Sequence, residues 1–456
     1  MGGKLADIRP FRGIRYNASR FGSELSFLVC PPFDVITPNL QRRLVRRHPR
    51  NMVRLELPSE TANDAPGAKY QRAASQFGAW LADGTLVQDS EPALYVYSCR
   101  FSVAGIQHER RGLFALVHLE PWERGIVRPH ERTLAGPKQD RLQLMRACEA
   151  NFSPIWLVYR GAVAEANALW NAVSTREPDI SLWDSENDSV RHSVWACTEP
   201  LAIRAFQQVL ADRPVYVADG HHRYETALGY RDELEKENGD LPENAAPNFV
   251  LAHMVQGDDP GLPVLGIQRL VRTSGPPDAN YIRRSLNTWF DLHETESGAR
   301  ELLWRLNSLP AGQIAFAVYA PRAHLSIVAV LKADIIPLSF SADHSEGWRR
   351  LDAAALHALG IDRLYSGGTQ SLIETGRLTY AYSPEEVERE IETSRADIAF
   401  LLRGTPVEQV MAVADAGDKM PEKSTYFYPK PVTGLVMAGL KGEVPIIDRS
   451  SGEKSN

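Results

Sequence analysis

Five consecutive residues able to handle metal, protons or phosphate stand mid-chain: Asp219, Gly220, His221, His222 and Arg223. The apolar residues 215–218 before them predict a β-strand, and residues 223–236 are good helix formers. Glycine in such a turn permits φ > 0 and a close approach to a ligand, and the amides that follow form the unpaired first turn of a helix, where anions bind. The alternative is an ordinary turn with an aspartate cap. The density of reactive groups favours a ligand site.

A second group suited to chemistry follows a proline in the run 128–133, Arg-Pro-His-Glu-Arg-Thr. Pro129 constrains a loop that presents His130 and Glu131, so Glu131 could serve as a general base. On the other interpretation, Glu131 is a solvated loop charge. The residue types alone favour neither interpretation.

The third group is the run 420–431, Met-Pro-Glu-Lys-Ser-Thr-Tyr-Phe-Tyr-Pro-Lys-Pro. Lys-Ser-Thr is typical of the end of a phosphate-binding loop, but the glycines of that loop are absent and Pro421 removes an amide, so we reject a Walker motif. A proline-framed loop remains, in which Lys423, Ser424 and Thr425 offer groups suited to a carboxylate or phosphate. A surface loop with aromatic packing is the alternative. We expect the loop to close over the central turn, with Lys423 within about 15 Å of Arg223.

A fourth candidate, Asp34, lies between apolar neighbours in the run 30–38, Cys-Pro-Pro-Phe-Asp-Val-Ile-Thr-Pro. The double proline predicts an extended loop. We favour an Asx-type turn or cap for Asp34 over a ligand role.

Composition bounds the class of protein. The 456 residues are 43% hydrophobic and 24% charged, which predicts a globular chain of two or three domains. A net charge of −6 argues against a nucleic-acid binder that works through overall charge. The four cysteines are far apart, a spacing that fits neither zinc nor a disulfide framework. No apolar run is long enough to span a membrane and no signal peptide is evident, so we expect a cytoplasmic protein.

Strand and helix patterns alternate along the chain and predict an α/β (α+β) protein. Residues 94–103 and 111–119 alternate as two antiparallel strands around a loop at 105–109, and residues 314–319 and 326–331 form a second hairpin. Single strands are predicted at 52–57 and 264–271.

The residues also carry a resemblance. The run Asp219 to Arg223 after an apolar strand resembles the signature of the ParB and sulfiredoxin superfamily, whose turn of this kind binds nucleotide phosphates. The segments Pro129 to Glu131 and Thr405 to Thr425 resemble parts of the archaeal free serine kinases in that superfamily. From Pro31 to Lys430 the chain also resembles a bacterial family of unknown function with the same motifs. The stretch between Glu131 and Asp219 is longer than expected for the kinases.

The resemblance implies a ParB/sulfiredoxin-like core at 126–255, after an N-terminal α/β scaffold at 1–125 and before a C-terminal α/β region at 256–456 that contributes the Lys423 loop. It implies Glu131 as the base, with Asp219 and His221 also catalytic. Nucleotide would bind at Gly220, His221, His222 and Arg223, with Mg²⁺ on Asp219. A substrate or phosphate pocket would be lined by His130, Lys423, Ser424 and Thr425.

The function implied is a small-molecule kinase that transfers a phosphoryl group from ATP or ADP to serine or a similar amino acid. A ParB-like nucleotide switch and a phosphatase working through His221 and a metal stay open as alternatives. The switch would be expected to carry a basic helix-turn-helix, which is not evident in the sequence. The expected partners are a nucleotide and an amino acid, with no membrane and no nucleic acid.

Overall fold

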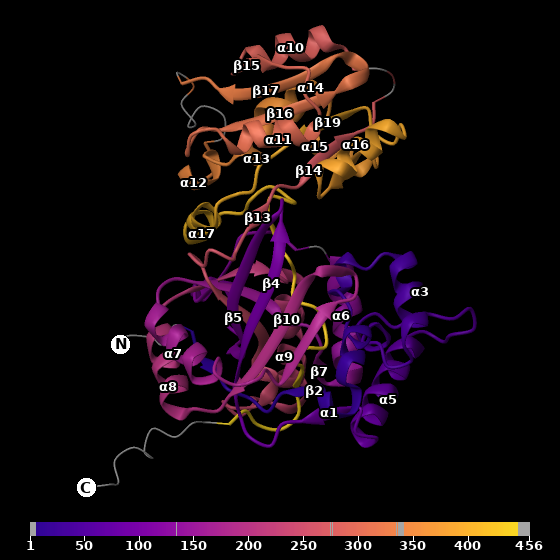
Figure 1. Ribbon diagram of the computed structural model, residues 1–456, viewed down its shortest axis with the longest axis vertical. Helices are drawn as coiled ribbons and strands as arrows, with labels where there is room; N and C mark the ends of the chain where they lie inside the picture. The colour runs from indigo at the N-terminus through magenta and orange to yellow at the C-terminus, as the bar shows by residue number, and fades with distance from the viewer. Residues whose placement is uncertain are drawn as a thin grey trace. The chain divides into compact units, whose positions relative to one another are not determined.

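The computed structural model describes residues 6–133, 135–273, 275, 277–333, 335 and 342–445. The chain divides into two compact units (Figure 1). Unit 1 comprises Met1–Pro129, Thr133–Leu262 and Pro429–Asn456, and unit 2 comprises His130–Arg132 and Pro263–Tyr428. Both units are mixed α/β, which confirms the predicted fold class.

Unit 1 is built on a nine-stranded mixed sheet with the order β6-β11-β8-β12-β5-β4-β10-β9, and β1 pairs with β5. Two further pairs, β2 with β3 and β7 with β21, lie outside this sheet. The strands of unit 1 are β1 (Ile8–Arg9), β2 (Ile14–Tyr16), β3 (Leu86–Gln88), β4 (Leu94–Val103), β5 (Ile106–His118), β6 (Val127–Pro129), β7 (Ala150–Asn151), β8 (Ile155–Tyr159), β9 (Ile180–Asp184), β10 (Asn187–Cys197), β11 (Val215–Asp219), β12 (Phe249–Gln256) and β21 (Ala438–Gly439). Its helices are α1 (Ala18–Phe21), α2 (Leu25–Leu28), α3 (Pro38–Arg47), α4 (Val53–Glu56), α5 (Ala68–Ala82), α6 (Ala135–Cys148), α7 (Val163–Val173), α8 (Pro200–Leu210) and α9 (His221–Asn238).

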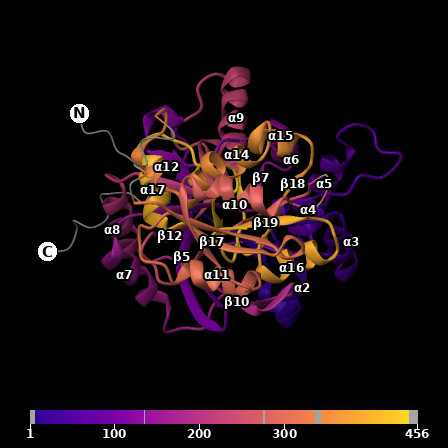
Figure 2. The ribbon, with the colours of Figure 1, turned by 90° about the horizontal axis from the view of Figure 1, so that it is seen from above.

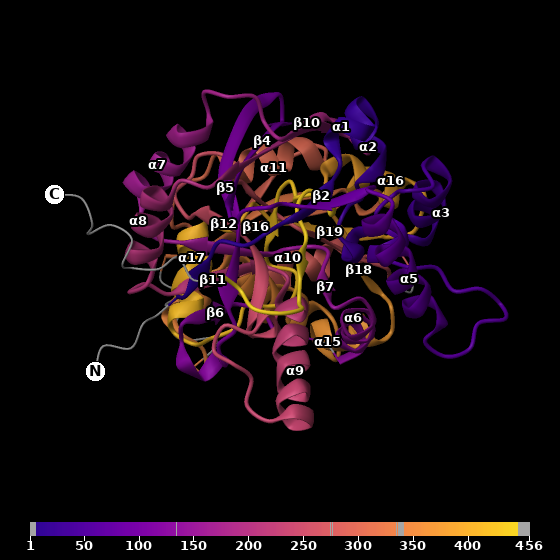
Figure 3. The ribbon, with the colours of Figure 1, turned by 90° about the horizontal axis from the view of Figure 1, so that it is seen from below.

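The core of unit 1 lies between one face of this sheet and its helices. Alternate residues of β11, Val215 and Val217, pack with apolar side chains of α7, α8 and the first half of α9. The second half of α9 is mostly polar and extends beyond the neighbouring elements of the unit (Figure 3). The buried first half of α9 therefore fixes the turn that precedes it.

Unit 2 has a six-stranded antiparallel sheet with the order β15-β17-β16-β19-β14-β18, and a separate pair of β13 with β20. Its strands are β13 (Val264–Leu265), β14 (Gln268–Val271), β15 (Phe290–Glu294), β16 (Ala315–Ala320), β17 (Leu325–Leu331), β18 (Leu378–Ala381), β19 (Ile398–Leu401) and β20 (Tyr426–Phe427). Its helices are α10 (Ala279–Asn287), α11 (Ala299–Asn307), α12 (Glu346–Arg349), α13 (Asp352–Ala355), α14 (Asp362–Leu364), α15 (Gly368–Glu374), α16 (Pro384–Glu392) and α17 (Val407–Asp415). Figure 2 shows α10, α14 and α15 on one side of β17 and β19, and α11 and α16 on the other, where each set buries its own apolar cluster.

Most predicted elements are present, and three predictions are corrected. Residues 53–56 form a helix and no strand, because the buried Asn51 side chain accepts a hydrogen bond from the Val53 amide at 2.9 Å and so turns the backbone where the helix begins. The loop predicted at 105–109 is a tight turn, since β5 already begins at Ile106. The strand predicted at 264–271 is divided into β13 and β14 at Gly266, where a Cβ would lie 1.8 Å from the carbonyl oxygen of Leu402.

The three predicted regions do not coincide with the two units. Strands from region 1–125 and from region 126–255 share the nine-stranded sheet, because β5 pairs with β12. The segment from Pro429 onward belongs to unit 1, apart from the rest of region 256–456. All four cysteines are free and buried. None of the helices in the described ranges has the length and hydropathy needed to cross a membrane.

Candidate functional site

The turn between β11 and α9 has the geometry that the sequence predicts. β11 is buried up to its last residue, Asp219, and Gly220 follows at φ 90° and ψ 26° as the residue before the helix. A Cβ at Gly220 would lie 3.1 Å from two nitrogens of Arg223 and 3.2 Å from the Cα of Ile155. Both the left-handed backbone and the tight space therefore require glycine. Because the residue before α9 is glycine, it offers no side chain to cap the first backbone amides of the helix.

Two cations hold the carboxylate of Asp219. Arg223 donates to Oδ2 over 2.6 Å, and the ammonium of Lys430 lies 2.7 Å from Oδ1. Arg223 is 9% exposed and also donates to the carbonyl oxygen of Pro154. Because its guanidinium bonds both to Asp219 of β11 and to the segment before β8, Arg223 stabilises the turn and also places a positive charge there.

Lys430 reaches this cluster from the C-terminal segment, and Asp34 reaches it from the N-terminal loop. The Lys430 ammonium donates to Oδ2 of Asp34. Within the described ranges, the Asp34 side chain pairs with Lys430 and caps no backbone amide of its own turn. The Asx-type turn or cap predicted for Asp34 is therefore wrong. The physical reason is that its partner lies 396 positions away, beyond any local pattern.

Electrostatics keeps these groups ionised. Burial by itself would raise the pKa of Asp219, but the charges of Lys430 and Arg223 outweigh it and hold that pKa well below its ordinary value. Burial likewise opposes the charge of Lys430, whereas Asp219 and Asp34 raise its pKa above the ordinary value. The cluster therefore keeps opposite charges in contact at neutral pH.

A layer of buried polar groups supports the cluster from behind. The fully buried Arg110 donates to the carbonyl oxygen of Pro429 over 2.8 Å, and its guanidinium lies 4.3 Å from the ring centre of Trp156. Trp156 is the register partner of Asp219 across β8 and β11. Arg110 thus ties the backbone next to Lys430 to the strand next to Asp219.

A small cavity of about 40 Å³ borders Arg223 on another side. Its polar lining includes the buried side chains of Glu56, Arg141 and Thr226. Arg141 also covers the ring of Phe33 at 4.4 Å, next to Asp34. The predicted N-terminal scaffold therefore contributes directly to the surroundings of the turn.

In unit 2 the structure brings the second and third groups of predicted residues together. The carbonyl oxygen of the fully buried His130 accepts from the Met420 amide over 2.8 Å, and its Nε2 lies 3.1 Å from Oγ1 of Thr425. Lys423 has a left-handed backbone at φ 58°, and the Ser424 hydroxyl donates to the carbonyl oxygen of Pro421. The Lys423 loop is thus fastened at both ends to the residue that precedes Glu131.

The predicted site residues therefore fall into two groups. Asp219, Gly220, His221, His222 and Arg223 belong to unit 1, whereas His130, Glu131, Lys423, Ser424 and Thr425 belong to unit 2. The expected approach of Lys423 to Arg223 stays a prediction. Sequence reasoning missed Lys430 and left Asp34 as a cap. The available signal was the Pro429-Lys430-Pro431 run, in which two prolines restrain a single cation.

The charged partners of Asp219 decide whether this carboxylate can bind the predicted Mg²⁺ ion. Each of its carboxylate oxygens already accepts from a cation, and Asp34 shares one of those cations. Across the described ranges, no group of three histidine, cysteine, aspartate or glutamate side chains is arranged to hold a metal ion. The geometry therefore does not fit a Mg²⁺ ion bound directly to Asp219.

Comparison with known proteins gives a family. The model of DUF1015, described as a protein of unknown function, matches residues 8–354. The chain belongs to the DUF1015 family. The DUF1015 match includes Asp34, Glu131 and the turn at Gly220, and it ends before Lys423 and Lys430. No curated protein matches the sequence.

Several solved structures show distant similarity to this DUF1015 chain. A conserved hypothetical protein from Pyrococcus furiosus is 14% identical, with 72% of this chain and 95% of that chain covered and a TM-score of 0.34. A free serine kinase in complex with AMP is 12% identical, with 72% and 91% covered and a TM-score of 0.36. SbnI from Staphylococcus aureus, with a C-terminal truncation, is 11% identical, with 72% and 87% covered and a TM-score of 0.32. Such scores assign no role to any residue.

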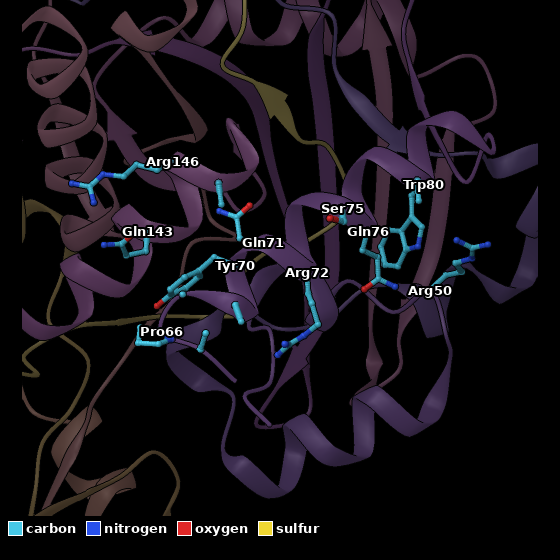
Figure 4. A pocket seen from close by; sticks show the side chains of 15 residues that line it. Arg50, Pro66, Tyr70, Gln71, Arg72, Ser75, Gln76, Trp80, Gln143 and Arg146 are labelled. Atoms are coloured by element: carbon cyan, nitrogen blue, oxygen red, sulfur yellow. The ribbon is translucent and has the colours of Figure 1, made fainter. Parts of the chain in front are cut away.

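A wider hollow of about 1120 Å³ lies elsewhere on the DUF1015 chain, over α5 and α6 (Figure 4). None of the predicted site residues lines it. Its arginines pair with neighbouring carboxylates: Arg50 with Asp83, Arg72 with Asp64 and Arg146 with Glu233. The predicted site residues therefore do not belong to this hollow.

Proposed function

We propose that this protein is a phosphotransferase that moves a phosphoryl group from ATP or ADP to the hydroxyl of serine or a similar amino acid. The observation that carries the proposal is the turn at Gly220: a left-handed glycine opens a long helix beside a buried arginine, a setting that suits phosphate oxygens. Mg²⁺ would accompany the nucleotide as a counter-ion of its phosphates.

The nucleotide phosphates would lie against the first amides of α9, with His221, His222 and Arg223 supplying polar and charged contacts. Phosphoryl transfer requires mainly positioning and neutralisation of charge, and both are available where the turn is braced by Arg223. The resemblance of the sequence to free serine kinases agrees with this use of the turn.

Glu131 would act as the general base. Pro129 of β6 is the register partner of Val217 of β11 in a parallel ladder, and Glu131 follows Pro129 by two residues. Covalent geometry keeps two residues within about 7 Å of chain. Glu131 is therefore attached to the strand that neighbours the one ending at Asp219.

In the reaction, the Glu131 carboxylate would take the proton of the acceptor hydroxyl as its oxygen forms a bond to the terminal phosphorus. The bond from that phosphorus to the bridging oxygen would break, and ADP would leave from ATP, or AMP from ADP. His130, Lys423, Ser424 and Thr425 would line the acceptor pocket, since they are fastened to the segment that carries Glu131.

The test is Glu131→Gln, assayed for consumption of ATP and ADP against a panel of amino acids. We expect turnover to fall by about 10²–10⁴-fold, with nucleotide affinity within a few fold of wild type. Glu123→Gln, an exposed carboxylate in the turn before β6, is the matched control. Near-normal turnover in Glu131→Gln contradicts the assigned base. Nucleotide consumption that needs no acceptor would instead identify a hydrolysing switch.

A further inference from the structure

Lys430 is fixed in place more firmly than a surface lysine. Pro429 and Pro431 flank it, and Arg110, with no exposed surface, holds the carbonyl oxygen of Pro429. Only 12% of the Lys430 side chain is exposed. Since a mobile lysine side chain must lose rotamer freedom when it binds, a held lysine is pre-organised for its partner.

The ammonium of Lys430 has three donors, and the structure accounts for two of them. One donates to Oδ2 of Asp34 and one to Oδ1 of Asp219, 2.7 Å away. In the part of the chain that the structure describes, no further acceptor contacts this ammonium. The third donor can therefore serve a ligand.

A divalent metal at a phosphate site is usually bound by one or two carboxylates and by phosphate oxygens, and Asp34 and Asp219 would offer such carboxylates beside the proposed phosphate site. Here the ammonium of Lys430 takes the central position, and the other oxygen of Asp219 is taken by Arg223.

We propose that Lys430 is the built-in cation of the phosphate site: it contacts a phosphate of the bound nucleotide and takes the position between Asp34 and Asp219 that a protein-bound metal would take. The inference rests on the proposed function for the identity of the ligand, and it assigns to Lys430 the charge neutralisation at this point. Asp34 balances the ammonium while the site is empty.

Binding of inorganic pyrophosphate and ADP to the full chain, measured by calorimetry, tests the contact. Loss of one charge-assisted contact in Lys430→Met should weaken both ligands by about 10- to 150-fold. Lys441→Met is the matched control, because Lys441 lies on the same segment, has a side chain that is 76% exposed and pairs with Glu149. Affinities within twofold of wild type in Lys430→Met would overturn the proposal.

Asp34→Asn is a second test, because a purely structural role of Lys430 predicts no tighter pyrophosphate binding in this variant. The variant also replaces Lys430→Met if that protein does not fold. The change keeps an acceptor for Lys430 and removes one negative charge. Pyrophosphate binding should therefore tighten by about three- to tenfold, whereas unchanged or weaker binding would count against the proposal.

Thermal unfolding with Mn²⁺ alone tests the replacement of a metal. Wild type should show no shift with Mn²⁺, and Lys430→Met should gain a Mn²⁺-dependent rise in Tm because Asp34 and Asp219 lose their shared cation. An equal rise in wild type would overturn the replacement. Wild type that binds ADP but transfers no phosphoryl group contradicts the proposed function alone, whereas wild type that binds neither ligand contradicts both proposals.

Discussion

Replacement of Arg223 by alanine separates its two roles, bracing the turn and binding phosphate. The variant loses two hydrogen bonds of a buried guanidinium, to Asp219 at 2.6 Å and to the carbonyl oxygen of Pro154. At about 1.5–3 kcal/mol for each charge-assisted bond, and with Asp219 left on a single cation, we expect a loss of about 3–5 kcal/mol in the free energy of unfolding.

The loss is measured by urea denaturation, and nucleotide affinity is then measured by calorimetry at a temperature where the variant is folded. The matched control is Arg146→Ala, since Arg146 also pairs with a carboxylate of α9, Glu233, but both side chains are at least one third exposed. We expect the control to lose less than about 1 kcal/mol.

The two measurements refute different parts of the reasoning. A loss of unfolding free energy in Arg223→Ala no larger than in Arg146→Ala would show that the pair of Arg223 with Asp219 does not stabilise the fold. In folded Arg223→Ala we also expect ADP affinity to fall by about tenfold or more, and unchanged affinity would refute the phosphate role of the turn.

Two further predictions concern the sheet behind the turn and the turn itself. Burial and Arg110 lower the pKa of the fully buried His192 to about 3, so its contribution to stability is present above the unfolded pKa near 6.5 and is lost as pH falls. At pH 4.5 the neutral, buried His192 should lower the free energy of unfolding by about 3 kcal/mol, and a urea titration in which His192→Gln shows the same acid slope as wild type would contradict this. Gly220→Ala should lower the free energy of unfolding by about 1–3 kcal/mol, because alanine would be strained in the left-handed backbone and would meet close contacts. Gly229→Ala in the same helix, with open space around its Cβ, should raise the free energy of unfolding by up to about 1 kcal/mol. Equal denaturation midpoints for the two variants would show that the turn does not require glycine.

The sequence by itself determined the features that depend on neighbouring residues. The alternation of β11 and the helix formers after it fix strand, turn and helix, and Gly220 marks the left-handed residue between them. The hairpins at 94–118 and 315–331 follow for the same reason. Side-chain periodicity and turn chemistry act over a few residues, so one segment suffices to predict them.

The tertiary structure alone decided which distant groups meet. Lys430 reaches Asp34 and Asp219 only because the segment after Tyr428 returns to unit 1, and His130 meets Thr425 across 295 positions. Local propensity also failed at residues 53–56, where the turn formed by Asn51 and the Val53 amide starts a helix. Ion pairs between segments depend on sheet order and burial, which no single segment encodes, and the cation of the site was therefore invisible until the chain was folded.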